Sequence, residues 1–272
     1  MPPARELDPG SSALAFFGSE LRQHRVRAGL SQEQLAERLS YSLSLVCAIE
    51  LARRTPSRDF AERADQALGT GGALVRLWPL VRNAAHPAWF RPWLEIEQAA
   101  LALLTWQPLL VPGLLQTEEY AREVLSQEPA ATDEQIEAAI TARMSRKAIL
   151  HRPDPPMYGV VIDEWVLYRP IGAPAIMRAQ VRSLIESACL PNVTLQVVPR
   201  ECPAVAGLTG AFVIARIPGD PDLVYVESAR EGYVSDRPPD VESIARRFDV
   251  IRSLALPVNT TLDLLSKVVE EI

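Results

Sequence analysis

The chain has 272 residues, 48% of them hydrophobic and 23% charged, which suits about two compact domains that each bury a core. No apolar run reaches the roughly 18 residues needed to cross a bilayer, and the first residues lack the basic-then-apolar order of a leader peptide. We therefore expect a cytoplasmic protein without a membrane partner. The three cysteines, Cys47, Cys189 and Cys202, are too far apart for a disulfide framework or a zinc site.

The net charge of −6 is unevenly distributed along the chain. Residues 1–82 carry 11 arginines and 9 acids, hence +2, whereas residues 83–272 carry 17 basic and 25 acidic residues, hence −8. Within residues 13–58 the balance is 7 arginines against 4 acids. The N-terminal part can therefore face a phosphate backbone, while the acidic remainder limits indiscriminate binding to nucleic acid.

Residues 13–85 have the pattern of five short helices. The first helix is expected to stop at Gly29, which can adopt the left-handed conformation that ends helices. The second begins at Ser31, with Gln34 completing a capping box, and the third begins at Ser42. This region is predicted to form a separate helical domain.

Beyond this region the pattern changes twice. A connector is predicted at 86–93, followed by a helical segment at 94–152 whose first helix runs from about 94 to 106. Residues 153–272 combine strands with helices, so the predicted fold class is α+β, with a small β-sheet flanked by helices in the C-terminal domain. The predicted strands are 157–162, 193–198, 211–217 and 223–227, and the predicted helices are 173–189, 240–254 and 260–271.

Residues 31–50 have the features of a helix-turn-helix. The small residue Ala36 lets a second helix cross closely, Ser40 and Tyr41 form the turn, and Ser42–Glu50 is the helix expected to enter the major groove of DNA. The segments Leu21-Arg22, Ala28–Ala36, Ile49-Glu50 and Arg53–Ser57 resemble the lambda-repressor/Cro (XRE) type of regulator.

This resemblance implies which side chains contact DNA. Gln32 and Ser44 would contact phosphates or base edges, the third helix would present its outer residues to the groove, and the arginines after it would meet phosphates. Arg25 and Glu50 would form an ion pair that ties the first helix to the third. The expected DNA-binding residues are Gln32, Ser42, Leu43, Ser44, Leu45, Ala48, Arg53, Arg54 and Arg58.

The sequence departs from the usual pattern in the reading helix itself. Positions that often carry polar readers hold Leu43 and Ala48, with Cys47 beside them, and Ala52 replaces the usual glycine. No bidentate pair with guanine or adenine is available from these side chains. Contact with thymine methyl groups, hydrogen bonding by Ser44 and DNA shape would then carry specificity. The alternative is a partner-binding or dimerisation module with the same fold and no DNA affinity.

From residue 93 onward the chain resembles the C-terminal domain of actinobacterial antitoxin-like transcriptional regulators, the WhiJ-like group. The segments that carry the resemblance are Leu94–Ala99, Leu110–Arg122, Ile162–Glu164, Val197–Pro199, Gly207–Phe212 and Val224–Glu227. The resemblance implies regulation together with a small partner protein encoded alongside. A homodimer on a double-stranded, pseudo-palindromic DNA operator is expected, because one short helix covers only a half-site.

Two sets of residues in this region have competing interpretations. Leu114, Leu115 and Gln116 belong to a rigid apolar loop, which is either a buried connection between helices or part of a groove for the partner. Asp163, Glu164 and Glu227 are either solvated or capping carboxylates or a converging acid–base or cation site.

The sequence gives no indication of an enzyme. The three histidines lack a ligand at metal-binding spacing, and neither a Walker loop nor a nucleophile elbow occurs. We therefore expect no catalytic residues, no metal and no cofactor. The alternative function is a transcriptional regulator that senses a small molecule in its C-terminal domain.

Overall fold

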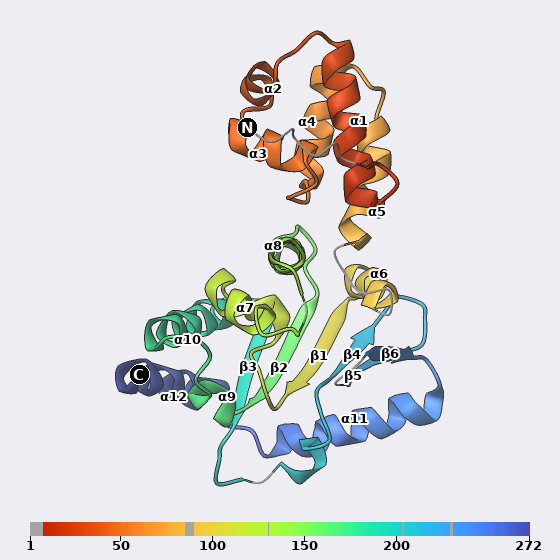
Figure 1. Cartoon of the computed structure of the whole chain (residues 1–272). Coiled ribbons are helices and arrows are strands. Elements are labelled where there is room, and N and C mark those ends of the chain that lie inside the picture. The colour runs from red at the N-terminus through yellow and green to blue at the C-terminus, as the bar shows by residue number, and fades with distance from the viewer. Residues whose placement is uncertain (1–7, 85–89, 130, 203, 229–230) are drawn as a thin grey trace. The chain divides into compact units, whose positions relative to one another are not determined.

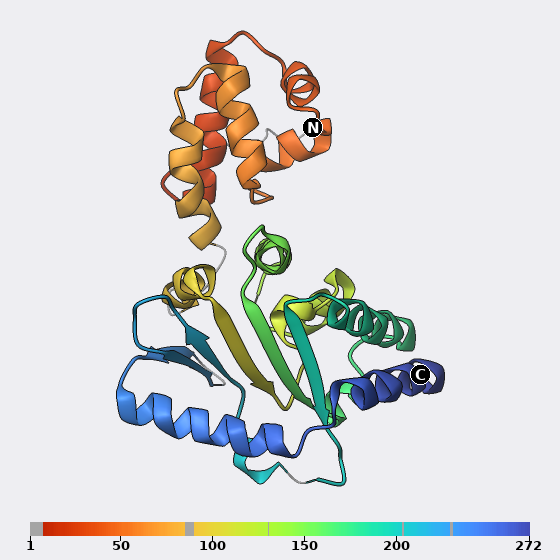
Figure 2. The ribbon, with the colours of Figure 1, turned by 180° about the vertical axis from the view of Figure 1, so that it is seen from behind.

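The structure is a computed structural model that describes residues 8–84, 90–129, 131–202, 204–228 and 231–272 (Figures 1 and 2). Backbone contacts divide it into two compact units. One comprises the described parts of residues 1–88 together with 128–145, and the other comprises those of 89–127 and 146–272. The boundaries expected from the sequence remain a proposal, although the last residues of the predicted connector are helical because α6 begins at Arg91.

The first unit is built from helices. They are α1 (Ala13–Arg27), α2 (Gln32–Leu39), α3 (Leu43–Glu50), α4 (Arg58–Leu68), α5 (Ala73–Ala84) and α8 (Asp133–Arg146), the last residue of α8 lying in the second unit. The N-terminal ends of α1 to α4 share one device, a serine hydroxyl that accepts the backbone N–H three residues on; the four caps are Ser12, Ser31, Ser42 and Ser57. The capping box predicted at Ser31 and Gln34 is confirmed.

The second unit contains a mixed six-stranded sheet in the order β3-β2-β1-β4-β5-β6. β1 pairs in parallel with β2, and β2 with β3, whereas β4, β5 and β6 continue from β1 as antiparallel strands. The strands are β1 (Ala102–Gln107), β2 (Met157–Asp163), β3 (Val193–Val198), β4 (Phe212–Arg216), β5 (Leu223–Glu227) and β6 (Gly232–Ser235). The predicted α+β class is confirmed.

Helices cover both faces of this sheet. The longer ones are α6 (Arg91–Ala99), α7 (Glu118–Leu125), α10 (Pro174–Ala188), α11 (Pro238–Ser253) and α12 (Val258–Glu271), and the short ones are η2 (Gly113–Leu115), η3 (Lys147–His151), α9 (Trp165–Tyr168) and η4 (Val205–Gly207). One core holds side chains of α6, α7, α10 and α12 against one face. A second core holds Phe248 and Ile251 of α11 against the other. Figures 1 and 2 show α7, α10 and α12 together, and α11 apart from them.

The helix predicted at 94–106 is wrong in its second half. The structure ends α6 at Ala99 and places the central strand β1 at Ala102–Gln107. Alanine and leucine, which dominate this stretch, are strong helix formers, so the local preference favoured a longer helix. A central strand buried on both faces shows no alternation that would have contradicted it.

Candidate nucleic-acid interface

The predicted helix-turn-helix is present between Ser31 and Glu50. α2 ends at Leu39, and the next residue, Ser40, takes the left-handed conformation with φ of 58°. The N–H of Tyr41 donates to the carbonyl of Ala36 at 3.0 Å. The Ser42 hydroxyl then accepts the N–H of Leu45 at 3.3 Å and starts α3. Ala36 is only 3% exposed, which agrees with its predicted place between the two helices.

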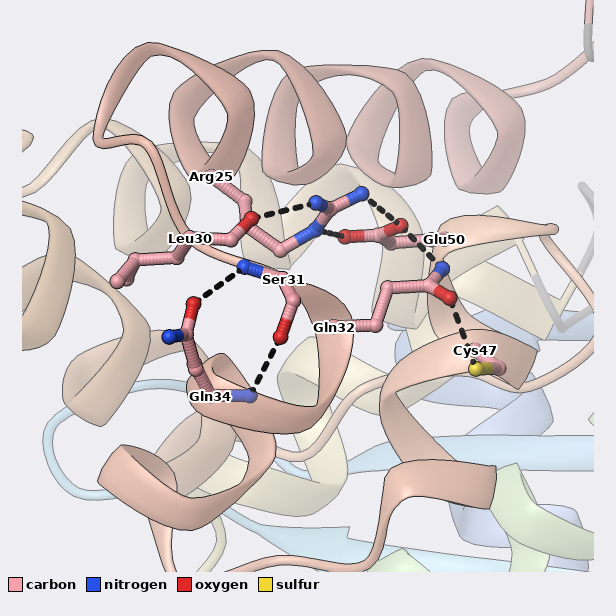
Figure 3. A network of polar contacts seen from close by, with 7 residues as sticks. All are labelled: Arg25, Leu30, Ser31, Gln32, Gln34, Cys47 and Glu50. Atoms are coloured by element: carbon pink, nitrogen blue, oxygen red, sulfur yellow. Dashed lines mark hydrogen bonds and ion pairs between the residues drawn. The ribbon is translucent and has the colours of Figure 1, made fainter.

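A bidentate ion pair fixes α3 against α1. Nε of Arg25 donates to Oε1 of Glu50 at 2.5 Å, and its Nη2 donates to Oε2 at 2.9 Å (Figure 3). The third guanidinium nitrogen, Nη1, donates to the carbonyl of Leu30 at 2.8 Å. The hydrogen bond to Glu50 raises the pKa of Arg25 against the opposing effect of burial. The ion pair expected from the sequence is therefore formed, and the protein encloses both charges.

Gln32 is held by this pair and by α3. Its Nε2 donates to Oε2 of Glu50 at 2.7 Å, and its Oε1 accepts the thiol of Cys47 at 3.2 Å (Figure 3). Sequence reasoning placed Gln32 at a phosphate or a base edge and missed both contacts. Glu50 lies 18 residues away, and no local sequence pattern marks a hydrogen bond across that separation.

The outer side of α3 is exposed where it begins. Ser42, Leu43 and Ser44 are exposed, and Leu43 retains 44% of its accessible surface. Leu45 is half-buried against the N-terminal core, and Ala48 is half-buried. The residues predicted to face the groove thus fall into an exposed group at the start of α3 and a more enclosed group further along.

Basic side chains follow α3. Arg53 and Arg54 are exposed in the loop before α4, and Arg58 is exposed at the start of α4, where its Nε lies 2.8 Å from Oε1 of Glu62. Both side chains of this Arg58–Glu62 pair are exposed to solvent, so the pair adds little stability. Arg58 can therefore exchange Glu62 for another anionic partner. Three exposed arginines therefore follow the end of α3 in the chain.

Ala52 occupies an unfavourable backbone conformation. Its φ of 56° is left-handed, and among the described residues only Ser40 shares this conformation without being glycine. An L-residue pays roughly 1–2 kcal/mol there because its Cβ approaches a backbone oxygen. The left-handed backbone at position 52 would favour glycine, which is the usual residue there in regulators of the resembled type.

We expect Ala52→Gly to stabilise the N-terminal domain by about 0.5–1 kcal/mol, because relief of the left-handed penalty exceeds the entropy added to the unfolded chain. Hydrogen exchange of peptides from α1 to α4 in the full chain measures the gain. Ala28→Gly is the matched control, since Ala28 also ends a helix but has φ of −76°. Equal shifts in both variants would contradict the explanation.

The loop residues considered for partner binding lie inside the C-terminal domain. Leu114, Leu115 and Gln116 are 3%, 1% and 2% exposed, and both leucines belong to the core formed with α7 and α10. A partner cannot contact these side chains unless they leave that core. The burial favours the alternative interpretation, a buried connection between helices.

Hydrogen bonds explain why this loop can be buried. Nε2 of Gln116 donates to the carbonyl of Val111 at 2.7 Å. Gln180 of α10 donates to the carbonyl of Leu115 at 2.9 Å, and its Oε1 accepts the N–H of Thr117 at 2.8 Å. Two buried amides thus satisfy backbone groups that a tight loop would otherwise leave without partners.

The acids at the strand ends do not converge. Asp163 accepts the N–H of Trp165 at 2.9 Å, and the buried Glu164 accepts the N–H of Arg200 at 3.0 Å. Glu227 ends β5, which is separated from β2 by β1 and β4, hence by about 14 Å at the usual strand spacing.

Among the residues that the structure describes, no three His, Cys, Asp or Glu side chains are grouped to hold a metal ion. The described helices also include none with the length and apolarity of a membrane span.

Comparisons with known proteins find one match in the N-terminal part of the chain and one in the C-terminal part. A helix-turn-helix domain model matches residues 17–78, and a domain of unknown function, DUF5753, matches residues 90–267. Since the second match covers about two thirds of the chain, the protein belongs to the DUF5753 family. An uncharacterized HTH-type transcriptional regulator of Methanothermobacter thermautotrophicus is 43% identical over 49 residues, which are 18% of this chain and 71% of that protein. No solved structure matches.

Proposed function

We propose that the protein is a DNA-binding transcriptional regulator whose α3 enters the major groove. The observation that carries the proposal is the exposed start of α3 in a matched helix-turn-helix domain, with α3 fixed to α1 by the Arg25–Glu50 pair. A recognition helix must be rigid, because base contacts require defined positions. The relative's name supports the same function.

The regulator acts as a homodimer in this proposal. α3 has eight residues and is therefore about 12 Å long, so it spans only part of one operator half-site. Two copies related by a two-fold axis double the contacts and select a pseudo-palindromic operator. The half-sites would be separated by about one helical turn of DNA, or a multiple of it.

In vitro selection from a random duplex library tests the proposal directly. The full chain should enrich duplexes that contain two inverted copies of one short motif. Enrichment of a single unpaired motif would contradict the dimer. Failure to enrich any duplex at low salt would contradict DNA binding and favour the alternative, a helix-turn-helix fold that serves as a protein-binding module.

The arginines after α3 are proposed to contact phosphates. Replacing Arg53 and Arg54 together with alanine should weaken binding to all duplexes, because phosphate contacts carry no sequence information. The slope of log K against log salt should become shallower by about one unit per lost contact. Fluorescence anisotropy at four salt concentrations measures both effects.

The matched control removes the same charge elsewhere. Arg169 and Arg237 are exposed residues of the C-terminal domain, and replacing both with alanine changes the net charge equally. This variant should retain the slope of the unmodified protein. Identical slopes in all three proteins would remove Arg53 and Arg54 from the phosphate interface.

We further propose an antitoxin-like role in which the C-terminal domain binds a small protein encoded by a neighbouring gene. The support is the resemblance of residues 93–227 to antitoxin-like regulators. Co-expression with that small protein should yield a stable complex that changes the mobility of the operator. A small molecule that co-purifies and changes DNA affinity, without any such complex, would instead favour a ligand-sensing regulator.

A further inference from the structure

Leu43 is an exposed apolar side chain on the helix that meets DNA in the proposed function. It is the first residue of α3, directly after the Ser42 cap, and it is 44% exposed. The core of the domain is filled by Val46 and Ile49 of the same helix, which are fully buried. Leu43 is not among the side chains of that core, so core packing does not account for a large aliphatic side chain at this position.

The amide of Gln32, which the sequence suggested as a DNA contact, already takes part in two hydrogen bonds. An amide reads adenine by using its oxygen and its nitrogen together. In Gln32 the nitrogen is bonded to Glu50 and the oxygen to Cys47. Bidentate reading by Gln32 would break two hydrogen bonds, one of them to the carboxylate of the buried Glu50.

The residues on either side of Leu43 in the sequence, Ser42 and Ser44, carry short hydroxyls. Oγ of Ser42 lies 3.0 Å from Oγ of Ser44, and it also accepts the N–H of Leu45. Ser44 can hydrogen-bond to one group on DNA. A single hydroxyl can both donate and accept, so it discriminates poorly between the four bases. The long side chain at the exposed start of α3 is the apolar one.

We infer that Leu43 is a specificity-determining residue that reads the 5-methyl group of a pyrimidine in the major groove. Thymine presents this methyl group on the groove edge, and an aliphatic side chain is its natural contact. 5-Methylcytosine carries a methyl group on the same ring carbon. The contact therefore accepts thymine and 5-methylcytosine alike. Where cytosine occupies the contacted position, its methylation strengthens binding.

This inference rests on the proposed function, and the test separates the two. The operator obtained by selection is synthesised with deoxyuridine in place of each thymine in turn, which removes only the methyl group. For the unmodified full chain, substitution at one position in each half-site should reduce affinity about fourfold, which corresponds to the free energy of burying one methyl group. At that same position, 5-methylcytosine should bind about fourfold more tightly than cytosine.

Leu43→Ala assigns the effect to the residue. The variant should bind the operator with no dependence on the methyl group at that position, and it should keep its melting temperature because an exposed leucine is replaced by a good helix former. Leu80→Ala is the matched control, since Leu80 is 59% exposed on α5, and it should retain the full dependence.

Three outcomes would overturn the inference. A selected operator that is insensitive to every deoxyuridine substitution would exclude methyl reading while leaving DNA binding intact. Methyl dependence that persists in Leu43→Ala would assign it to another residue. A selection that recovers no duplex would remove the proposed function and this inference together.

Discussion

Replacing Glu50 with alanine is expected to destabilise the N-terminal domain by about 3–5 kcal/mol. The side chain of Arg25 is 10% exposed, and that of Glu50 is 1% exposed. Removal of Glu50 leaves the guanidinium enclosed without its counter-charge, and the desolvation cost is then no longer offset. Gln32 loses its hydrogen-bond acceptor in the same variant, which adds to the loss.

Hydrogen exchange of the full chain, resolved by peptide, measures this effect within the domain. The control replaces both partners with apolar residues, Arg25→Met together with Glu50→Leu, and should cost much less than Glu50→Ala alone. A double variant as unstable as the single one would show that packing around the pair matters more than the unpaired charge. A loss below about 1 kcal/mol in Glu50→Ala would show that water reaches the guanidinium, as it does for surface pairs.

Trp106→Ala is expected to destabilise the C-terminal domain by about 3–5 kcal/mol, the usual cost of removing a buried tryptophan. Trp106 is completely buried in β1 and packs in the core beneath α11. Its Nε1 donates to the carbonyl of Gly207 at 2.9 Å. The variant therefore creates a large cavity and leaves a buried carbonyl without its donor.

Trp106→Phe separates the two contributions. It retains an aromatic ring in the core but cannot donate to Gly207, so its loss should be smaller than that of the alanine variant. Peptides from β1, β2 and β4 report the change by hydrogen exchange. A phenylalanine variant as unstable as the alanine variant would assign most of the effect to the hydrogen bond. Gly207→Ala should also destabilise, since an added Cβ would overlap the indole nitrogen.

The N-terminal domain could be predicted well because its determinants are local. A capping box, a serine cap and a left-handed glycine each involve residues no more than four apart, so the sequence displays them directly. The starts of α2 at Gln32 and α3 at Leu43 follow their predicted caps. The ion pair between Arg25 and Glu50 was expected only through the family resemblance.

The sheet was predicted less completely because its pairings are not local. β2, β3, β4 and β5 were recognised by their β-branched and apolar runs. β1 was hidden in a stretch rich in alanine and leucine, and β6 is a four-residue edge strand without a distinctive pattern. Strand order is set by packing between distant segments, which one sequence does not display.

The candidate site shows the same division. The exposure of Leu43 and Ser44 agrees with the groove-facing positions that the family resemblance implied. The engagement of Gln32 with Glu50 and Cys47 was not predicted, because it depends on how two helices cross. The burial of the loop that contains Gln116 was one of two interpretations that the sequence left open. Burial in the structure favours it, and the supporting hydrogen bond from Gln180 of α10 to Leu115 spans 65 residues.

The central position of β1 also affects the order in which the protein can form during synthesis. Ala102 of β1 pairs with both Met157 and Arg216, so the sheet cannot close until the ribosome has passed residue 216. Helix α5 ends at Ala84. At about 5–20 residues per second, the ribosome takes on the order of 10 s to translate from Ala84 to residue 216. The helix-turn-helix contacts lie within residues 13–84 and can form throughout this interval. On each nascent chain, the helix-turn-helix can therefore be in place well before the C-terminal domain is finished.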